Sequence, residues 1–112
     1  MADQIDYIEF PSSNRAVTSA FFQAAFGWGI TSYGPDYDGI NNAGIDGGID
    51  QAAEKVSSTM AVVRTDDLDA AERRVIAAGG LITRPQFDFP GGRRFHFREP
   101  GGNEMAVYIA TE

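Results

Sequence analysis

Apolar and polar positions along the chain follow the same order twice. Each copy opens with a strand-like run, Ile5–Phe10 in the first and Thr59–Arg64 in the second. In Ile5–Phe10, side chains alternate between two faces, as in a half-buried β-strand. A polar residue then precedes a helix-forming stretch, Asn14 in the first copy and Asp67 in the second, and both residue types are good N-caps. The repeat predicts that the chain is built from two similar modules.

Both helices are predicted from apolar residues at helical spacing and from glycines that end the pattern. The first helix is expected over Arg15–Phe26, stopping at Gly27, and the second over the residues that follow Asp67, stopping at Gly79-Gly80. The expected buried stripes are Val17, Phe21, Ala24 and Ala25 in the first helix, and Leu68, Ala71, Val75 and Ala78 in the second. We expect Phe21, Phe26, Val75, Phe95 and Phe97 to be largely buried.

Short strands broken by turn residues follow each helix. The expected strands are Trp28–Tyr33, Tyr37–Asn41, Ala43–Asp50, Leu81–Phe87, Arg93–Arg98 and Glu104–Ile109. Pro90-Gly91 and Pro100-Gly101 each match a type II turn between antiparallel strands. The sequence therefore predicts an α+β fold of two βαβββ modules, with helices outside a curved, mainly antiparallel, cup-shaped sheet. Residues 1–112 would form a single domain, with module one at about 4–50, a connector at 51–57 and module two at about 58–110.

Composition narrows the function classes. The 112 residues include 16 acidic and 9 basic side chains, a net charge of -7. This balance argues against nucleic acid, because phosphate binding relies on clustered Lys and Arg. It also favours a neutral or cationic ligand over an anionic one. The absence of cysteine excludes disulfides, thiolate catalysis and zinc-thiolate sites. No signal peptide is visible and no apolar run has membrane-spanning length, so we expect a cytoplasmic protein without membrane contact.

Three stretches carry a family resemblance. Phe21–Trp28 is similar to an F-Y-x-x-x-F-G-W helix end, and Asp66–Ala71 with Ala77–Gly80 to a second-module helix. Pro100–Glu104 is similar to a D-P-x-G-N turn, although Glu99 stands where Asp is usual. In this order they resemble the vicinal oxygen chelate superfamily, which includes glyoxalases, bleomycin resistance proteins and extradiol dioxygenases. The resemblance implies a cup of two βαβββ modules, often within a dimer.

The resemblance also implies where a divalent metal would bind, through His and Glu side chains on the first and last strands of each module. Tyr7, Met60 and Ala106 occupy those positions here, and none is a good ligand for a hard divalent ion. A register slip by two residues would bring in Glu9 and Glu104 without adding a histidine. We therefore expect no metal and no other cofactor, with a divalent metal as the alternative.

The same strands present polar and aromatic side chains that suit an organic ligand. The candidate ligand-binding residues, expected to line a cleft between the modules, are Tyr7, Glu9, Met60, Arg94, His96, Glu104 and Tyr108. Glu9 and His96 are also weak candidates for a catalytic acid or base. For the glutamates, the alternative is a structural role in pairing with arginine. For His96 it is a structural hydrogen bond. Trp28 would either pack in the core or form an aromatic wall.

Three function classes remain open. The first is a small-molecule-binding or sequestering protein of the glyoxalase and bleomycin resistance type, without a metal. The second is a metal-dependent lyase, isomerase or dioxygenase, and the third is a metal-independent enzyme that uses Glu9 or His96. A homodimer is expected in each case, because short strands leave sheet edges for a partner to cover.

Overall fold

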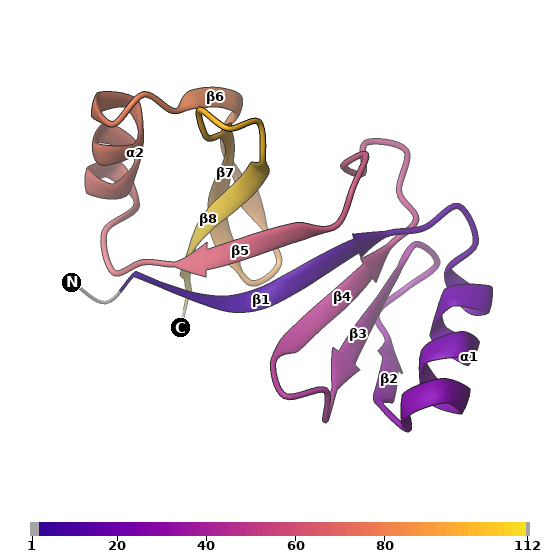
Figure 1. Cartoon of the computed structure of the whole chain (residues 1–112). Coiled ribbons are helices and arrows are strands. Elements are labelled where there is room, and N and C mark those ends of the chain that lie inside the picture. Colours follow the sequence, from indigo (N-terminus) through magenta and orange to yellow (C-terminus); the bar gives the residue numbers. More distant parts are fainter. Residues whose placement is uncertain (1–2, 112) are drawn as a thin grey trace. The chain divides into compact units, whose positions relative to one another are not determined.

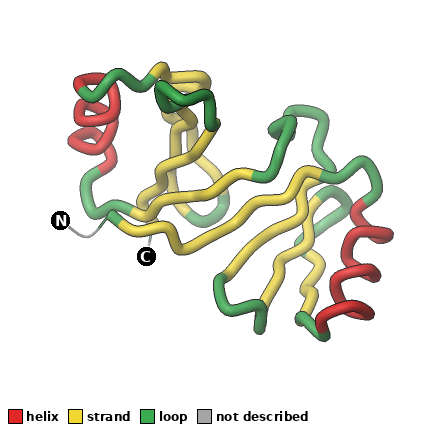
Figure 2. Tube along the Cα trace, in the orientation of Figure 1, coloured by secondary structure: helices red, strands yellow, loops and turns green. Residues whose placement is uncertain are grey.

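The computed structural model describes residues 3–111 of the chain. Its elements are β1 (Gln4–Pro11), α1 (Arg15–Phe26), β2 (Gly29–Ser32), β3 (Tyr37–Asn41), β4 (Asp46–Asp50), β5 (Met60–Arg64), α2 (Leu68–Ala77), β6 (Leu81–Phe89), β7 (Gly92–Arg98) and β8 (Glu104–Ala110). Figures 1 and 2 show one helix beside each group of strands. The order is βαβββ twice, so the predicted α+β fold is confirmed.

The chain divides into two compact units. The first unit is Tyr7–Met60, and the second combines the chain up to Asp6 with the chain from Ala61 onward. Strand β1 therefore contributes its first residues to the second unit and the rest to the first. Among the described residues, no helix is long and apolar enough to cross a membrane.

The first unit is a four-stranded sheet with the order β2-β3-β4-β1. Strand β4 pairs parallel with β1 and antiparallel with β3, and β2 forms the outer antiparallel edge. The register places Ile8 beside Gly47, and Gly47 beside Ile40. Glu9 aligns in the same way with Gly48. Neighbours in register point to the same face, so the odd-numbered positions of β1 lie on the face opposite to that of Ile8.

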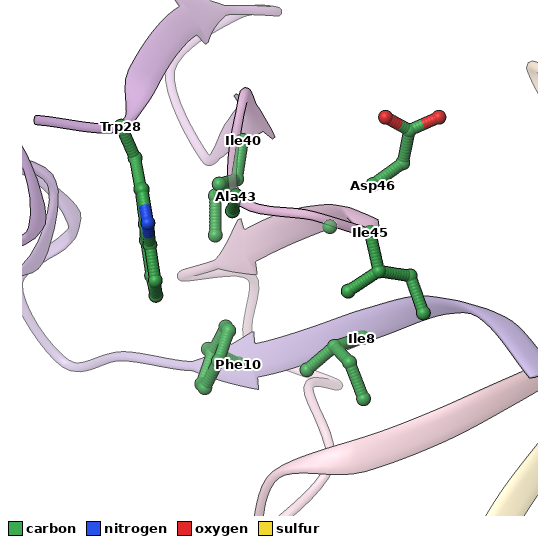
Figure 3. A pocket seen from close by; sticks show the side chains of 8 residues that line it. Ile8, Phe10, Trp28, Ile40, Ala43, Ile45 and Asp46 are labelled. Atoms are coloured by element: carbon green, nitrogen blue, oxygen red, sulfur yellow. The ribbon is translucent and has the colours of Figure 1, made fainter. Parts of the chain in front are cut away.

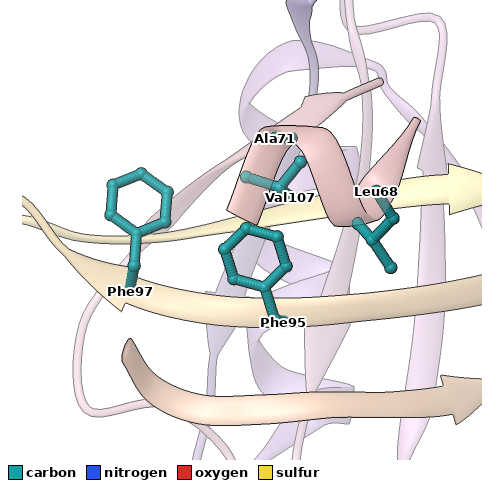
Figure 4. Packing of buried hydrophobic residues seen from close by; sticks show 5 residues of the cluster. All are labelled: Leu68, Ala71, Phe95, Phe97 and Val107. Carbon is teal, nitrogen blue, oxygen red and sulfur yellow. The ribbon is translucent and has the colours of Figure 1, made fainter. Parts of the chain in front are cut away.

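The second unit has the strand order β5-β8-β7-β6, with β5 parallel to β8 and antiparallel pairing elsewhere. Helix α2 covers one face of this sheet and packs on β6, β7 and β8. The core between helix and sheet consists of Leu68, Ala71, Phe95, Phe97 and Val107 (Figure 4). Truncating a ring such as Phe95 in this core is expected to cost about 3–5 kcal/mol.

The helix limits agree with the caps read from the sequence. The Asn14 side chain accepts a hydrogen bond from the Val17 amide at 3.3 Å, and Gly27 ends α1 in the left-handed region at φ 72°. The Asp67 carboxylate accepts from the Ala70 amide at 3.0 Å. These contacts span only a few residues, so local chemistry fixes both helix starts.

The buried face predicted for α1 is wrong. Phe21 and Phe26 are 60% and 59% exposed, whereas Ser19 is 6% exposed. Ser19 donates a hydrogen bond of 2.5 Å to the buried carboxylate of Asp38, and Arg15 pairs with the same carboxylate at 2.9 Å. A charged group on the sheet beneath the helix needs polar partners, so the helix turns its polar side inward.

The rest of that stripe is exposed as well, namely Val17, Ala24 and Ala25. Phe22 supplies the aromatic contact instead, with ring centroids 5.2 Å from Phe10 and 5.0 Å from Trp28. In α2 the predicted stripe is confirmed at Leu68 and Ala71, while Val75 is half-buried and Ala78 is exposed. Phe95 and Phe97 are buried as predicted.

The predicted type II turns are wrong in type. A type II turn needs a positive φ at its third residue, Gly91 or Gly101, but the positive φ angles belong to Gly92 at 154° and Gly102 at 104°. The Gly102 amide donates to the Glu99 carbonyl at 2.9 Å. Proline at the second position and glycine at the fourth are typical of a type I turn, and the Glu99 side chain supports this one by accepting from the Gly101 amide at 2.6 Å.

Candidate functional site

Two tyrosines and a glutamate gather on the helix-free face of the first unit. Tyr7 and Glu9 come from β1, and Tyr37 comes from the start of β3. The Tyr37 hydroxyl donates to the Glu9 carboxylate at 3.1 Å, and it also forms a short hydrogen bond with the Tyr7 hydroxyl. A phenol hydroxyl has one proton and can donate only one hydrogen bond. Because Tyr37 donates to Glu9, Tyr7 is the donor in the bond between the two tyrosines. The result is a hydrogen-bonded chain from Tyr7 through Tyr37 to Glu9, here called the tyrosine–glutamate group.

Glycines on β3 and β4 make room for these rings. A Cβ at Gly48 would lie 1.8 Å from the Tyr37 hydroxyl oxygen and 2.5 Å from that of Tyr7. A Cβ at Gly39 would lie 2.6 Å from the Tyr33 ring. Both glycines are buried, so the tyrosines lie directly on the strand backbone. The weak strand propensity of these segments is therefore part of how the aromatic face is built.

The environment keeps Tyr37 protonated. Burial raises the pKa of the Tyr37 hydroxyl well above the ordinary tyrosine value, and the charges of Glu9 and Tyr7 raise it further. Glu9 is 4% exposed. A phenol that donates a hydrogen bond to a buried carboxylate offsets part of the cost of burying that group. Glu9 is the acceptor end of this group, and Tyr7 is its other end.

An apolar pocket lies on the other face of the same unit, beside the end of α1. Its volume is about 230 Å³, and the residues that line it are Ile8, Phe10, Trp28, Ile40, Ala43, Ile45, Asp46 and Gly47. Figure 3 shows Trp28 and Phe10 on one side, Ile8 and Ile45 on the other, and the Asp46 carboxylate turned away. Trp28 also contacts Phe26 at 5.0 Å between ring centroids. Trp28 therefore packs against its aromatic neighbours, which is one of the two roles considered for it, and it also lines this pocket.

The second unit has a polar face of its own, opposite α2. The register aligns His96 with Ala106, and Arg94 with Tyr108. Glu104 lies two residues before Ala106 on β8, so its side chain points to the same face. Its carboxylate lies 3.9 Å from His96 Nδ1 and accepts a hydrogen bond of 2.8 Å from Thr83.

His96 is buried and held by its neighbour. Arg94 Nε lies 3.1 Å and Arg94 Nη2 lies 2.9 Å from His96 Nε2. A guanidinium has no acceptor atom, so Nε2 must be the unprotonated, accepting nitrogen and the proton sits on Nδ1. His96 is only 3% exposed, and Arg94 contacts its Nε2. His96 therefore makes a structural hydrogen bond, which was one of the two roles considered for it from the sequence.

Tyr108 and Met60 complete the predicted set. The Tyr108 hydroxyl donates to the Asp6 carboxylate at 2.8 Å, and burial together with this bond raises its pKa. Met60 is 1% exposed, which makes it a core residue in this structure. Tyr7 and Glu9 are thus joined in the first unit through Tyr37. Arg94, His96, Glu104 and Tyr108 share one face of the second.

The sequence reasoning missed Tyr37. Its strand was predicted, but nothing local marked its hydroxyl, because its partners lie 28 and 30 residues away. A signal did exist in the glycines of β3 and β4. Gly39 and Gly48 leave the middle of both strands without a side chain on this face, and such a gap is normally filled by a large neighbour.

The positions implied for a metal do not fit one. The Tyr7 hydroxyl is hydrogen-bonded to Tyr37, and Met60 has only a buried thioether. Ala106 has no side-chain atom that could bind a metal. Across residues 3–111, no three His, Asp or Glu side chains lie together in a group that could hold a metal ion. A divalent site needs several oxygen or nitrogen donors around one ion.

Comparison with known proteins defines the class. The model of the Glyoxalase/Bleomycin resistance protein/Dioxygenase superfamily matches residues 4–107, and the chain belongs to this superfamily. This confirms the resemblance found in the sequence motifs. No curated protein sequence matches the chain significantly.

Solved structures share the fold at low sequence identity. A superfamily member from Vibrio splendidus is 16% identical with a TM-score of 0.72, covering 92% of this chain and 96% of its own. Methylmalonyl-CoA epimerase from Mycobacterium tuberculosis is 13% identical with a TM-score of 0.74, covering 96% and 88%. The Mn(II)-bound glyoxalase from Novosphingobium aromaticivorans is 18% identical with a TM-score of 0.69, covering 95% of this chain and 38% of its own. At these identities the likeness concerns the fold alone.

Proposed function

We propose that this chain is a small-molecule-binding protein of the glyoxalase and bleomycin resistance type that works without a metal ion. The observation that carries the proposal is the tyrosine–glutamate group of the first unit. Two phenols and a carboxylate on one sheet face form a directional chain of hydrogen bonds, and the two tyrosine hydroxyls lie against Gly48. Aromatic surface with a few placed polar atoms is what a site for a small organic ligand needs.

The chemistry of the group indicates what it would bind. The Glu9 carboxylate accepts hydrogen bonds, so the matching ligand carries an N–H or O–H donor next to a flat apolar portion that can lie on the tyrosine rings. Tyr37 fixes the position of the carboxylate before a ligand arrives. A fixed acceptor loses less entropy on binding than a mobile side chain does.

A metal-independent enzyme is the second candidate, and the same hydrogen-bond chain supports it. Glu9 as general base would take a proton from a ligand O–H or from a C–H made acidic by a carbonyl, and would become a neutral acid. The transferred proton would stay on Glu9 until it returned to the product. A metal-dependent lyase, isomerase or dioxygenase gains no support from Tyr7, Met60 and Ala106.

The test compares how variants of the tyrosine–glutamate group and a control variant bind the same ligand. Compounds that raise the melting temperature of the wild-type protein are titrated by calorimetry into Tyr37→Phe, Glu9→Gln and Tyr33→Phe. Tyr33 is the control, because it lies near the same face but is 70% exposed. We expect about tenfold weaker binding to the first two variants, the loss of one charge-assisted hydrogen bond, and unchanged binding to the third. Equal affinity for all three variants would show that the ligand binds elsewhere.

We also propose a homodimer, supported by apolar side chains left on the outer side of α1. Val17, Phe21 and Phe26 are each about 60% exposed, and the rings of the two phenylalanines touch at 6.3 Å between centroids. A cluster of this kind on a small domain usually marks an interaction site. A second copy of the chain is the occupant proposed here, since symmetric dimers are the commonest assembly of soluble proteins.

A cytoplasmic location is part of the same proposal. The chain has no cysteine, whereas small secreted domains commonly rely on disulfides. Cell fractionation with an antibody to the chain tests the location, and recovery from the medium or a membrane fraction would contradict it.

A further inference from the structure

We propose that the helix-free face of the second unit binds the anionic group of a small organic molecule through the guanidinium group of Arg84, with Arg64 and Arg94 adding positive charge on the same face. This anion site goes beyond the proposed function, because it lies in the other unit and does not depend on the tyrosine–glutamate group. It also departs from the ligand charge that the net charge of the chain favours.

The strand register brings the three arginines to one face. Arg84 on β6 is aligned with His96 on β7. Arg94, two residues before His96, is aligned with Tyr108 on β8, and Tyr108 is aligned with Arg64 on β5. Aligned residues and residues two apart on a strand share a face, so all three guanidinium groups lie on the side away from α2.

Aromatic rings orient these cations. The Arg84 guanidinium carbon lies 3.7 Å from the centroid of the Phe87 ring, and that of Arg94 lies 5.6 Å from the centroids of both Phe87 and Phe89. Arg64 lies 6.0 Å from the centroid of Tyr108. The Arg84 guanidinium contacts the Phe87 ring with its flat face, so its N–H edge stays available to a planar carboxylate or a phosphate.

The positive charge of Arg84 and Arg64 is not neutralised by nearby carboxylates. Within residues 3–111, Arg84 has neither an ion pair nor a side-chain hydrogen bond, and Arg64 has no ion pair. Arg15, Arg74 and Arg93 in the same chain each pair with an aspartate. Arg84 and Arg64 differ from these three in having no ion pair among the described residues.

The carboxylates of this face have other partners. Asp6 accepts from the Tyr108 hydroxyl at 2.8 Å, and Glu104 accepts from Thr83 at 2.8 Å. Arg84 is half-buried, so part of its hydration is already lost in the folded protein. An anion that reached its N–H edge would form charge-assisted hydrogen bonds in a partly water-excluded setting, where they are stronger than in water.

The experiment titrates benzoate and inorganic phosphate separately into 15N-labelled protein at low ionic strength, where screening is weak. The variants are Arg84→Gln and the control Arg93→Gln, whose guanidinium lies on the opposite face and pairs with Asp88 at 2.8 Å. The expected result is saturable shifts of amides in β6 and β7, with about tenfold weaker binding to Arg84→Gln, as for one lost charge-assisted bond. Arg93→Gln should bind as the wild type does.

The two probes distinguish what the face prefers. Tighter binding of benzoate indicates a carboxylate carried on a flat apolar body that contacts Phe89, and tighter binding of phosphate indicates a phosphate ester. If Arg84→Gln fails to fold, Arg84→Lys is tested in its place. Lysine keeps the charge but cannot form two parallel N–H bonds to one anion, so this variant should bind several-fold more weakly. The absence of saturable shifts with both probes, or equal affinity of the arginine 84 variants and wild type, would overturn the proposal. A Tyr37→Phe protein should bind both anions normally, so failure of the first-unit proposal remains distinguishable.

Discussion

The Tyr37 hydroxyl donates a hydrogen bond of 3.1 Å to the Glu9 carboxylate, and this bond connects the start of β3 to the middle of β1. Glu9 is almost fully buried, and the bond from Tyr37 is one of the interactions that offset the cost of burying it. It also fixes which end of the tyrosine–glutamate group accepts hydrogen bonds.

Tyr37 should make the protein sensitive to alkaline pH. Burial and the Glu9 charge raise the folded-state pKa of Tyr37 above the unfolded value of about 10. Its contribution to stability is therefore fully present below about pH 10 and is lost as the pH rises further. Urea unfolding at pH 8 and at pH 10.5–11 should show a larger loss of stability for wild type than for Tyr37→Phe, by about 1 kcal/mol or less over this window.

The control for this prediction is Tyr33→Phe, which removes an exposed tyrosine and should keep the wild-type pH dependence. Tyr108, whose pKa is also raised, is present in all three proteins and contributes equally. Identical alkaline curves for wild type and Tyr37→Phe would rule out the proposed protonation state.

Gly48→Ala should disrupt the tyrosine–glutamate group. The added Cβ would lie 1.8 Å from the Tyr37 hydroxyl oxygen, so the ring must move off the strand. Overpacking of this kind costs about 1–3 kcal/mol of unfolding free energy, which chemical denaturation would measure. The double variant Gly48→Ala/Tyr37→Ala should cost less than the sum of the two single variants, because the clash with the Tyr37 ring is gone. Strict additivity would mean that the two residues are not in contact.

The two phenylalanines Phe95 and Phe21 should respond in opposite ways to truncation. Phe95 is fully buried in the core of the second unit, so Phe95→Ala should lower the unfolding free energy by about 3–5 kcal/mol. Phe21 is 60% exposed, so Phe21→Ala should change it by about 0.5–1 kcal/mol at most in the monomer. Urea titrations at low protein concentration measure both unfolding free energies. A large loss of unfolding free energy for Phe21→Ala would show that α1 buries that ring.

The oligomeric state should depend on the outer side of α1. Sedimentation of the wild type at micromolar concentration should give twice the chain mass of 12.1 kDa. Phe21→Ser combined with Phe26→Ser should shift the equilibrium to monomer without changing the circular dichroism spectrum, since both rings are exposed. Leu81→Ser, which removes a 66% exposed side chain in the second unit, is the control and should leave the dimer intact. A wild-type monomer would contradict the proposal.

Much of the fold could be predicted because its signals are local. Asn14, Gly27 and Asp67 act within a few residues, so they set the helix limits whatever the rest of the chain does. The second helix was also assigned to its correct face at Leu68 and Ala71, because its apolar stripe packs on apolar strands. Order and type of the elements followed from these patterns.

Two of the failed predictions depend on distant residues, whereas the third, the turn type, has a local cause. The orientation of α1 is set by Asp38, which lies 19 residues from Ser19 and is buried beneath the helix. No helical periodicity records the position of a charge on another element. The part played by Tyr37 was hidden for the same reason, and the turns at Pro90 and Pro100 kept their place but changed type because the following glycine takes the positive φ.

The central claim is that the chain binds a small organic ligand through the tyrosine–glutamate group without a metal ion. Native mass spectrometry tests it most directly, on protein purified without chelator and mixed with a ligand found by thermal-shift screening. The account predicts a complex whose added mass equals the organic ligand alone for wild type, and much reduced complex for Tyr37→Phe and Glu9→Gln. One zinc, nickel, iron or manganese ion per chain, or a complex that forms only after such an ion is added, would contradict it.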